Sequence, residues 1–315
     1  MDNPFAPWLH AGRTLILDGG LGTELERRGH HNLGRLWSSA LVETNPAALR
    51  GVHHDFLEAG ADVIATATYQ AAIPTLIECG HDEQSAAHLL RDAVQLAIDE
   101  RDASAPTALV AASIGPFGAH LADGSEYTGA YTHSEDELHA FQVERWHILA
   151  DSAADILACE TIPSISDVRA FARLLRETPD RWAWISLMCR DATHLADGTS
   201  LSEVFALLND IPNLIAVGAN CIPPAIAPAV MDTFRSSTSL PLMVYPNASN
   251  AWKMEMGRPL DELTVTEFAA ESKLWQSHDA QIIGGCCKTT PEHVRALKTA
   301  LSDSPSVTQS GKNLD

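Results

Sequence analysis

The chain has 315 residues, of which 45% are hydrophobic, enough to bury a large core. Its 41 acidic residues outnumber 21 basic ones, giving a net charge of -20 without any dense basic run, which argues against binding to nucleic acid or to an anionic membrane surface. No apolar run reaches the roughly 18 residues of a membrane helix, and the amino terminus lacks signal-peptide features, so we expect a cytoplasmic protein whose six cysteines are reduced.

Apolar runs alternate with longer amphipathic stretches along the chain. The runs predict buried strands at 14–18, 62–69, 107–114, 156–159, 182–189, 214–221, 241–245 and 281–287. The stretches that follow them predict helices at about 45–59, up to 101, 134–152, 166–177, 202–208, 225–234, 264–277 and 291–301. The runs are continuously apolar, as in a parallel sheet covered on both faces. We therefore expect an α/β fold, a single (β/α)8 TIM barrel over residues 1–304, followed by a flexible polar tail at 305–315.

Two connections are too long for simple turns. They span residues 19–44, after the first predicted strand, and 115–133, after the third. Loops that follow the strands of such a barrel lie on its catalytic face. We therefore expect both segments to cover a substrate.

Three cysteines stand at the ends of two predicted strands. Cys221 ends the sixth strand, and Cys286 and Cys287 end the eighth. The carboxyl ends of barrel strands share one face, so the three sulfurs can converge. Three thiolates with an open fourth position form the ligand pattern of a catalytic zinc. Incidental buried thiols, or a disulfide between the two adjacent cysteines, remain as alternatives.

A zinc ion with three thiolate ligands favours one reaction class. Its site carries a net negative charge, binds an incoming thiol and lowers the pKa of that thiol, so it suits thiol alkylation better than hydrolysis. The 14 histidines show no H-E-x-x-H spacing, and we assign them to surface or core positions.

Two carboxylates also stand at predicted strand ends. Asp18 opens a glycine-rich turn whose residues Gly19 and Gly20 can expose backbone N–H groups to a substrate carboxylate, although such glycines often serve only a turn. Glu160 follows a buried apolar run and suits a cationic amine, although it could equally be a surface residue.

The chain resembles the homocysteine S-methyltransferase family from about residue 12 to about residue 300. The motifs that carry this resemblance are Asp18-Gly19-Gly20-Leu21-Gly22-Thr23-Glu24-Leu25, Leu36-Trp37-Ser38, Gly60-Ala61-Asp62-Val63-Ile64, Thr66-Ala67-Thr68-Tyr69-Gln70, Ser113-Ile114-Gly115-Pro116, Glu160-Thr161, Gly218-Ala219-Asn220-Cys221 and Gly284-Gly285-Cys286-Cys287. The cysteine motifs are the most specific of these.

The resemblance implies a zinc-dependent (β/α)8 barrel that transfers a methyl group to L-homocysteine and produces L-methionine. Its catalytic zinc ligands would be Cys221, Cys286 and Cys287. The substrate would be bound by Asp18 and Glu160 through its amino group and by Gly19 and Gly20 near its carboxylate, with Asn220 and Tyr127 as further substrate-binding residues.

The segment 124–131 resembles the loop of family members that use S-methylmethionine or S-adenosylmethionine, and we take S-methylmethionine as the expected donor. Both donors are sulfonium cations, which aromatic faces attract; the candidates are Trp37, Tyr69, Tyr127 and Tyr131, with Glu126 nearby. These rings could equally be packing or lid residues. After residue 247 the chain lacks an acidic residue expected from the family.

Three alternatives stay open at this point. The acceptor could be another small thiol or a selenol, or the barrel could bind zinc or sense redox state without catalysis. A phosphate site at Gly284 and Gly285 is a third possibility, disfavoured by the acidic chain and by the cysteines that follow directly.

Overall fold

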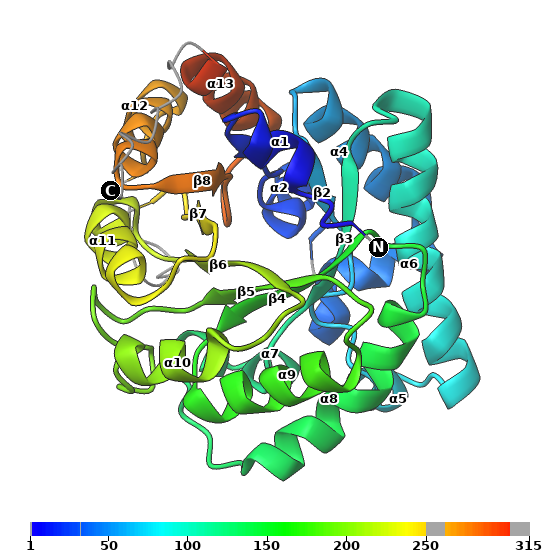
Figure 1. The fold of residues 1–315 in the computed structure, drawn as a ribbon. Coiled ribbons are helices and arrows are strands. Elements are labelled where there is room, and N and C mark those ends of the chain that lie inside the picture. The colour runs from blue at the N-terminus through cyan, green and yellow to red at the C-terminus, as the bar shows by residue number, and fades with distance from the viewer. Residues whose placement is uncertain (1, 32, 250–261, 303–315) are drawn as a thin grey trace.

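The computed structural model describes residues 2–31, 33–249 and 262–302. Eight parallel strands form one sheet in the order β1-β8-β7-β6-β5-β4-β3-β2, and the helices lie outside this ring (Figure 1). The strands are β1 Leu15–Ile16, β2 Val63–Ala65, β3 Leu109–Ile114, β4 Ile156–Ile162, β5 Ala183–Leu187, β6 Leu214–Asn220, β7 Leu242–Tyr245 and β8 Ala280–Ile283. The predicted TIM barrel is confirmed.

The ring closes between β1 and β2. Leu17 makes a parallel bridge to Val63, and the Asp18 N–H donates to the Val63 carbonyl at 3.0 Å. The Asp18 carboxylate accepts from the Ala65 N–H at 2.8 Å. A side chain of the candidate site therefore also joins the first and second strands.

The helices predicted from the sequence are found within a few residues of their expected bounds, and further short helices lie in the amino-terminal segment and in the two long connections. They are α1 Ala6–His10, α2 Leu21–Arg27, α3 Leu41–Thr44, α4 Pro46–Glu58, α5 Ile73–Glu78, α6 Glu83–Ser104, α7 Phe117–Leu121, α8 Glu135–Ala150, α9 Ile165–Glu177, α10 Leu201–Leu208, α11 Ala227–Ser237, α12 Val265–Ser277 and α13 Pro291–Ser302. Three short 3-10 helices, η1 Gly34–Ala40, η2 Ser125–Tyr127 and η3 Pro224–Ile226, complete the described elements. None of the described helices is long and apolar enough to cross a membrane.

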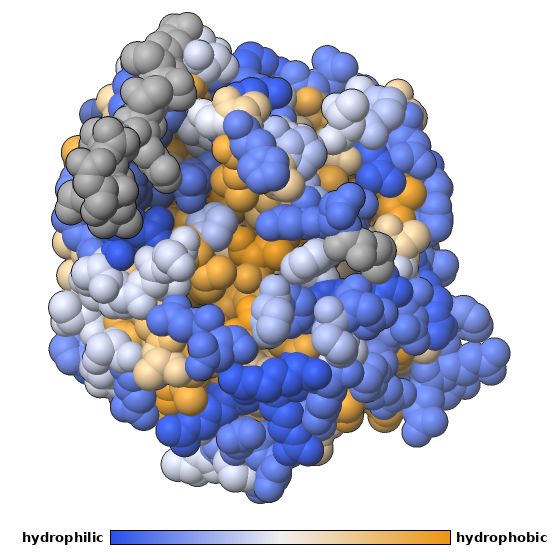
Figure 2. Space-filling view, in the orientation of Figure 1, coloured by the Kyte–Doolittle hydropathy of each residue, from blue (hydrophilic) through white to orange (hydrophobic). Residues whose placement is uncertain are grey.

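Helix α9 illustrates how sequence places a helix on the ring. Its buried residues Val168, Phe171, Ala172 and Leu175 follow the i, i+3, i+4, i+7 spacing of one helix face. Ser164 caps its start by accepting from the third helical N–H. The space-filling view shows apolar residues over the middle of one face of the molecule and hydrophilic residues around them, as the acidic composition leads us to expect (Figure 2).

The amino-terminal end of the barrel is closed from inside by Phe5. This side chain is fully buried and stacks on Trp184 with ring centroids 6.1 Å apart. It belongs to an interior cluster that includes Ile156, the first residue of β4, and Ile215, the second of β6. Among the described residues, the end of the barrel left for a ligand is therefore the opposite one, where the strands terminate.

Three details differ from the sequence prediction. The strand predicted to end at residue 159 continues to Ile162, so Glu160 and Thr161 lie inside β4, where the register with β5 shifts. The long connections are not plain loops: residues 19–44 hold α2, η1 and α3, and residues 115–133 hold α7 and η2. The predicted tail at 305–315 lies outside the described residues. The segment after residue 247, which lacks the acidic residue expected from the family, also lies mostly outside them, because residues 250–261 are not described.

Candidate active site and metal centre

A cavity opens at the carboxyl ends of the strands. It encloses about 820 Å³ including its open mouth. Its lining comes from the barrel interior and from both long connections: Leu17, Asp18, Gly19, Gly20, Leu21, Gly22, Thr23, Trp37, Ser38, Val63, Ala65, Thr66, Tyr69, Ser113, Tyr127, Glu160, Thr161, Trp184, Asn220, Cys221, Tyr245, Gly285, Cys286 and Cys287. The lining includes all the predicted zinc ligands and all the residues predicted to bind homocysteine.

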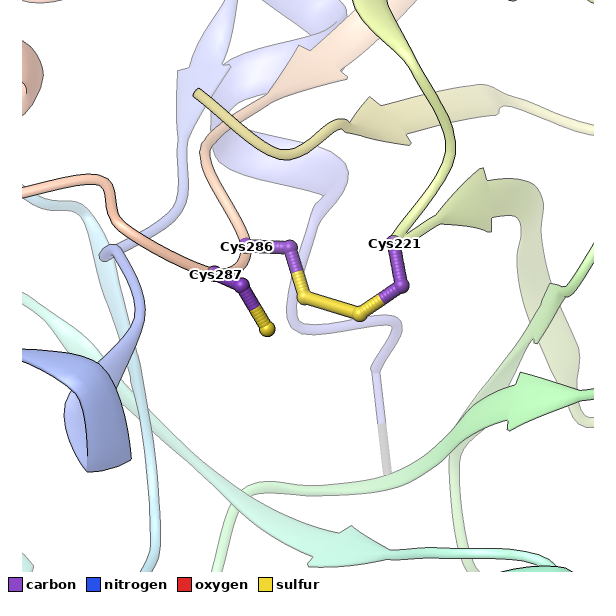
Figure 3. Close-up of side chains that lie close together, drawn as sticks. All are labelled: Cys221, Cys286 and Cys287. Atoms are coloured by element: carbon purple, nitrogen blue, oxygen red, sulfur yellow. A yellow bond between two sulfur atoms is a disulfide. The ribbon is translucent and has the colours of Figure 1, made fainter. Parts of the chain in front are cut away.

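The three cysteines meet in this cavity. Cys221 follows β6 and the two adjacent cysteines follow β8, and the three sulfurs lie within 4.8 Å of one another (Figure 3). In this structure Cys221 and Cys286 are joined by a disulfide and Cys287 is free. The vicinal disulfide considered from the sequence is therefore replaced by a bridge between strands, and all three sulfurs become available as ligands only when that bridge is reduced.

Two asparagines hold the cysteine segments in place. Asn247 accepts from the Cys287 N–H at 3.1 Å and donates to the Cys221 carbonyl at 3.0 Å, so one side chain joins both cysteine segments. Asn220 donates to Thr161 Oγ1 at 2.8 Å and lies 3.9 Å from Cys286 Sγ. Asn220 therefore contacts a cysteine sulfur and also joins β6 to β4 across the barrel interior.

Unusual backbone conformations surround the cysteines. Cys221 and Thr161 have φ of 54° and 58°, in the left-handed region that side chains other than glycine rarely adopt. Thr161 lies in the irregular part of β4, and bulges beside active sites commonly redirect side chains. Backbone strain of this kind persists where the surrounding structure imposes it, which agrees with a functional site.

The free thiol does not ionise readily in its present surroundings. Burial, with a smaller contribution from the charge of Glu26, raises the pKa of Cys287 to about 11, although the Tyr127 hydroxyl donates a hydrogen bond to it. A thiolate there needs a cation beside it, and a soft divalent ion suits a set of three sulfurs. The residues present thus fit a metal with three thiolate ligands.

Two carboxylates stand in the same cavity, and no cationic side chain in the described part of the chain pairs with either of them. Burial raises the pKa of Glu160 to about 7, despite hydrogen bonds from Ser113 and Tyr245 that lower it. Burial also raises the pKa of Asp18 well above its usual range, and the Glu160 charge adds to this effect. A bound ammonium group would lower both pKa values again, so the pair is suited to recognise an amine.

The glycine turn plays two different roles. The Gly20 N–H already donates to Thr289, at 3.0 Å to its hydroxyl and 3.3 Å to its carbonyl, and a Cβ on Gly20 would lie 2.6 Å from the Cys286 carbonyl. Gly20 therefore lets the first loop approach the cysteine segment. The Gly19 N–H makes no hydrogen bond within the described residues, so it alone of the two can still bind a carboxylate.

Three aromatic side chains line the mouth of the cavity. Tyr127 comes from η2, Tyr69 follows β2, and Trp37 comes from η1, where its φ of 47° turns it over Gly22. The Trp37 ring N–H donates to Glu26 at 2.9 Å. The fourth predicted aromatic, Tyr131, is outside the lining.

Tyr131 contributes to the loop's anchorage instead. Its hydroxyl donates to Asp167 at 2.5 Å, and Asp167 lies buried in the first turn of α9. The contact joins the connection after β3 to the helix after β4.

Several lining residues were missed from the sequence. Trp184 and Tyr245 lie inside the barrel, and the Trp184 ring N–H points to the Tyr245 hydroxyl at 3.3 Å. The strands that carry them were recognised as continuously apolar, but such a run does not tell which alternate residues face the interior. Asn247, which is outside the lining, follows β7 after one intervening residue, and its position after a strand was a usable signal.

Comparison with known proteins agrees with this geometry. A profile of the homocysteine S-methyltransferase family matches residues 15–301. Homocysteine S-methyltransferase YbgG of Bacillus subtilis is 36% identical over 304 residues, which cover 94% of this chain and 96% of that protein.

Two crystal structures of the homocysteine methyltransferase MmuM from Escherichia coli are also similar. The metallated form has a TM-score of 0.85 and 40% identity, covering 94% of this chain and 99% of that one. The oxidized form has a TM-score of 0.86 and 41% identity, covering 95% and 99%. The chain thus belongs to the homocysteine S-methyltransferase family and is an enzyme of that class.

Proposed function

We propose that the protein transfers a methyl group from S-methyl-L-methionine, or from S-adenosylmethionine, to L-homocysteine in a zinc-dependent reaction that yields L-methionine. The observation that carries this proposal is the convergence of three cysteine sulfurs in the same cavity as two carboxylates that no cationic side chain pairs with, as far as the structure describes the chain. The metallated form of a relative named for homocysteine supports a metal at the cysteines.

The acceptor would be held at both ends. Asp18 and Glu160 would bind its ammonium group, and the Gly19 N–H would bind its carboxylate. Its sulfur would then reach the cysteine face of the cavity. Fixing both ends of a small molecule restricts the position of its reactive atom, which is how binding accelerates a bimolecular transfer.

Cys221, Cys286 and Cys287 would hold the zinc ion, which when bound lowers the pKa of the acceptor thiol. The aromatic residues Trp37 and Tyr127 would hold the donor on the open side. A bond forms between the acceptor sulfur and the methyl carbon as the bond from that carbon to the donor sulfonium sulfur breaks. The electron pair stays on the donor sulfur, which leaves as a neutral thioether, and the thiol proton goes to solvent.

The reaction fits a reducing, cytoplasmic setting that keeps the three thiols free, and we assign catalysis to a barrel domain spanning residues 1–304. Another small thiol or a selenol could use the same cysteines and carboxylates as an acceptor. A barrel that binds zinc or senses redox state without catalysis would leave Asp18 and Glu160 without a role, so we place that reading second.

The test is methionine formation from isotope-labelled homocysteine by reduced, zinc-loaded protein. S-methylmethionine, S-adenosylmethionine and betaine are supplied separately, and zinc content is measured on the same sample. We expect labelled methionine with a sulfonium donor and about one zinc per chain. No product from any donor, with zinc bound, would mean that the acceptor or the enzymatic proposal is wrong.

A further inference from the structure

Glu126 is a buried carboxylate that differs from its counterparts. Four acidic residues are buried in the described part of the chain: Asp18, Glu24, Glu126 and Asp167. The Ala65 amide donates to Asp18, two arginines pair with Glu24, and the hydroxyl groups of Tyr131 and Ser164 donate to Asp167. Glu126 Oε2 has no hydrogen-bond partner, and only the residue's own backbone amide contacts the carboxylate.

The unpaired carboxylate of Glu126 belongs to a residue next to the cavity. The residue is 8% exposed and lies in η2, between Ser125 and the cavity residue Tyr127. Its backbone packs so closely on α7 that a Cβ on Gly118 would lie 2.4 Å from the Glu126 nitrogen. The backbone of η2 is therefore fixed at this point, and the carboxylate is buried next to the cavity residue Tyr127, where ionisation without a partner costs free energy.

The charge of Glu126 acts on residues that line the cavity. Burial and then the Glu126 charge raise the pKa of Tyr69. At Tyr127 the charge of Cys287 and burial raise the pKa most, and Glu126 adds to them. Within residues 2–31, 33–249 and 262–302, the charge that acts on Glu126 itself is that of Asp123, which is also negative. Burial and then the Asp123 charge raise the pKa of Glu126 itself, and no described side chain neutralises its ionised form.

We propose that Glu126 selects a cationic methyl donor, its negative charge attracting the donor's sulfonium group through the wall formed by Tyr69 and Tyr127. Aromatic faces and a carboxylate behind them together form a site for a cation that has few hydrogen-bonding groups of its own. The inference rests on the proposed function, because it takes the methyl donor to be a sulfonium cation.

The chemistry predicts which kinetic constant responds. The donor is a cation when it binds, and it becomes a neutral thioether as the methyl group leaves. A fixed negative charge therefore stabilises the bound donor more than the transition state, in which the positive charge is partly lost. Removing the charge should weaken donor binding without slowing the bound complex.

The experiment compares Glu126→Gln with the wild-type enzyme in steady-state kinetics. We expect the KM for the sulfonium donor to rise about tenfold or more, with kcat unchanged or slightly higher and the KM for homocysteine within about twofold. Asp123→Asn is the matched control, because it removes the same charge three residues away at an exposed position and keeps an acceptor for the Ser125 N–H. We expect its constants to match those of the wild type.

A binding measurement isolates the charge itself. S-methylmethionine and methionine differ by one methyl group and one positive charge, so the ratio of their dissociation constants reports selection for a cation. We expect Glu126→Gln to reduce that ratio about tenfold and Glu126→Asp, which keeps the charge, to preserve most of it.

The outcomes separate the two proposals. A wild-type enzyme that transfers no methyl group from a sulfonium donor overturns the proposed function. An active wild type with an unchanged donor KM in Glu126→Gln overturns the role of Glu126. Equal loss of donor binding in the Gln and Asp variants, or a fall in kcat, assigns Glu126 to packing and likewise overturns its role.

Discussion

The amino-terminal end of the barrel is closed by apolar side chains, whereas the carboxyl-terminal end gathers thiols and carboxylates around a cavity. At the first end Phe5 is fully buried on Trp184. At the second end burial raises the pKa of both Glu160 and Cys287, so folding there opposes the charged forms. The contrast indicates that the apolar end stabilises the fold and that the polar end costs stability for the sake of binding.

Trp184 stands between the two regions. One side of its ring packs on Phe5, and the residue also lines the cavity, where its N–H points to the Tyr245 hydroxyl. Tyr245 in turn hydrogen-bonds Glu160. A rigid apolar base therefore supports a carboxylate of the binding site through two aromatic side chains.

Cys287→Ser should give the largest effect and leave the closed end untouched. Loss of one of three sulfurs removes a metal ligand, because a serine hydroxyl is a poor ligand for a soft metal. We expect zinc content to fall to near zero and turnover to drop by more than about a thousandfold. Metal analysis and the labelled-homocysteine assay measure both.

The matched control is Cys79→Ser, at an exposed cysteine on the outside of the barrel. Its zinc content and turnover should equal those of the wild type. A Cys287→Ser protein that keeps its metal and its activity would contradict the assignment of Cys287 as a zinc ligand required for catalysis.

Phe5→Ala should lower stability and leave catalysis unchanged, the opposite of Cys287→Ser. Emptying a fully buried aromatic site leaves a cavity, and such changes cost about 3–5 kcal/mol in the free energy of unfolding. We expect denaturant unfolding of the reduced protein to report a loss of that size, with kcat per folded molecule unchanged. Ile77→Ala, at a side chain that is 45% exposed, should change stability by less than about 0.5 kcal/mol. If Phe5→Ala instead lowers kcat at full stability, the two ends are not separate in function.

Glu160→Gln should change how the free energy of unfolding depends on pH, through the polar end of the barrel. Burial raises the pKa of Glu160 from 4.5 to about 7, so between these values the folded protein holds a proton that the unfolded chain releases. The free energy of unfolding therefore falls as pH rises through this window, by up to about 3 kcal/mol. Glu160→Gln lacks this loss, and we expect it to be the more stable protein at pH 8 but not at pH 4.5.

Chemical unfolding of metal-free protein at several pH values measures this difference. Glu58→Gln, an exposed glutamate on α4, is the control and should follow the wild-type pH dependence. The same Glu160→Gln protein should bind homocysteine more weakly, because its amide cannot pair with the ammonium group. If the free energy of unfolding depends on pH in the same way in the wild type and in Glu160→Gln, the pKa of Glu160 is not raised in the folded protein.

Much of this arrangement could be predicted from the sequence. The barrel followed from apolar runs that alternate with amphipathic stretches, because a parallel sheet covered on both faces must be apolar throughout. The cysteines followed from their place directly after two such runs, since strand ends share a face. These inferences depend on local pattern and on a general property of the fold.

The remaining features depend on contacts between distant segments. The extension of β4 past Glu160 arises from a register shift against β5, which no local pattern signals. The role of Asn247 requires two cysteine segments to lie side by side, and the closing of the barrel by Phe5 requires the amino terminus to reach its interior. The lack of a hydrogen-bond partner for Glu126 Oε2 likewise depends on the positions of the side chains around it, which local sequence does not specify.

Tyr127→Phe should produce the smallest change, confined to the polar end. The Tyr127 hydroxyl donates a hydrogen bond to the Cys287 sulfur. Removing such a contact from a metal ligand typically lowers metal affinity 10- to 100-fold. We expect zinc affinity to fall about tenfold here, because all three ligands remain. Competition with a chromophoric chelator measures zinc affinity directly. Tyr131→Phe makes the same change in the same connection, but its hydroxyl donates to Asp167, so it should lower stability by about 1–2 kcal/mol and leave zinc affinity unaltered. Equal zinc affinities in all three proteins would show that the Tyr127 hydroxyl does not act on the metal centre, and would limit its role to lining the cavity.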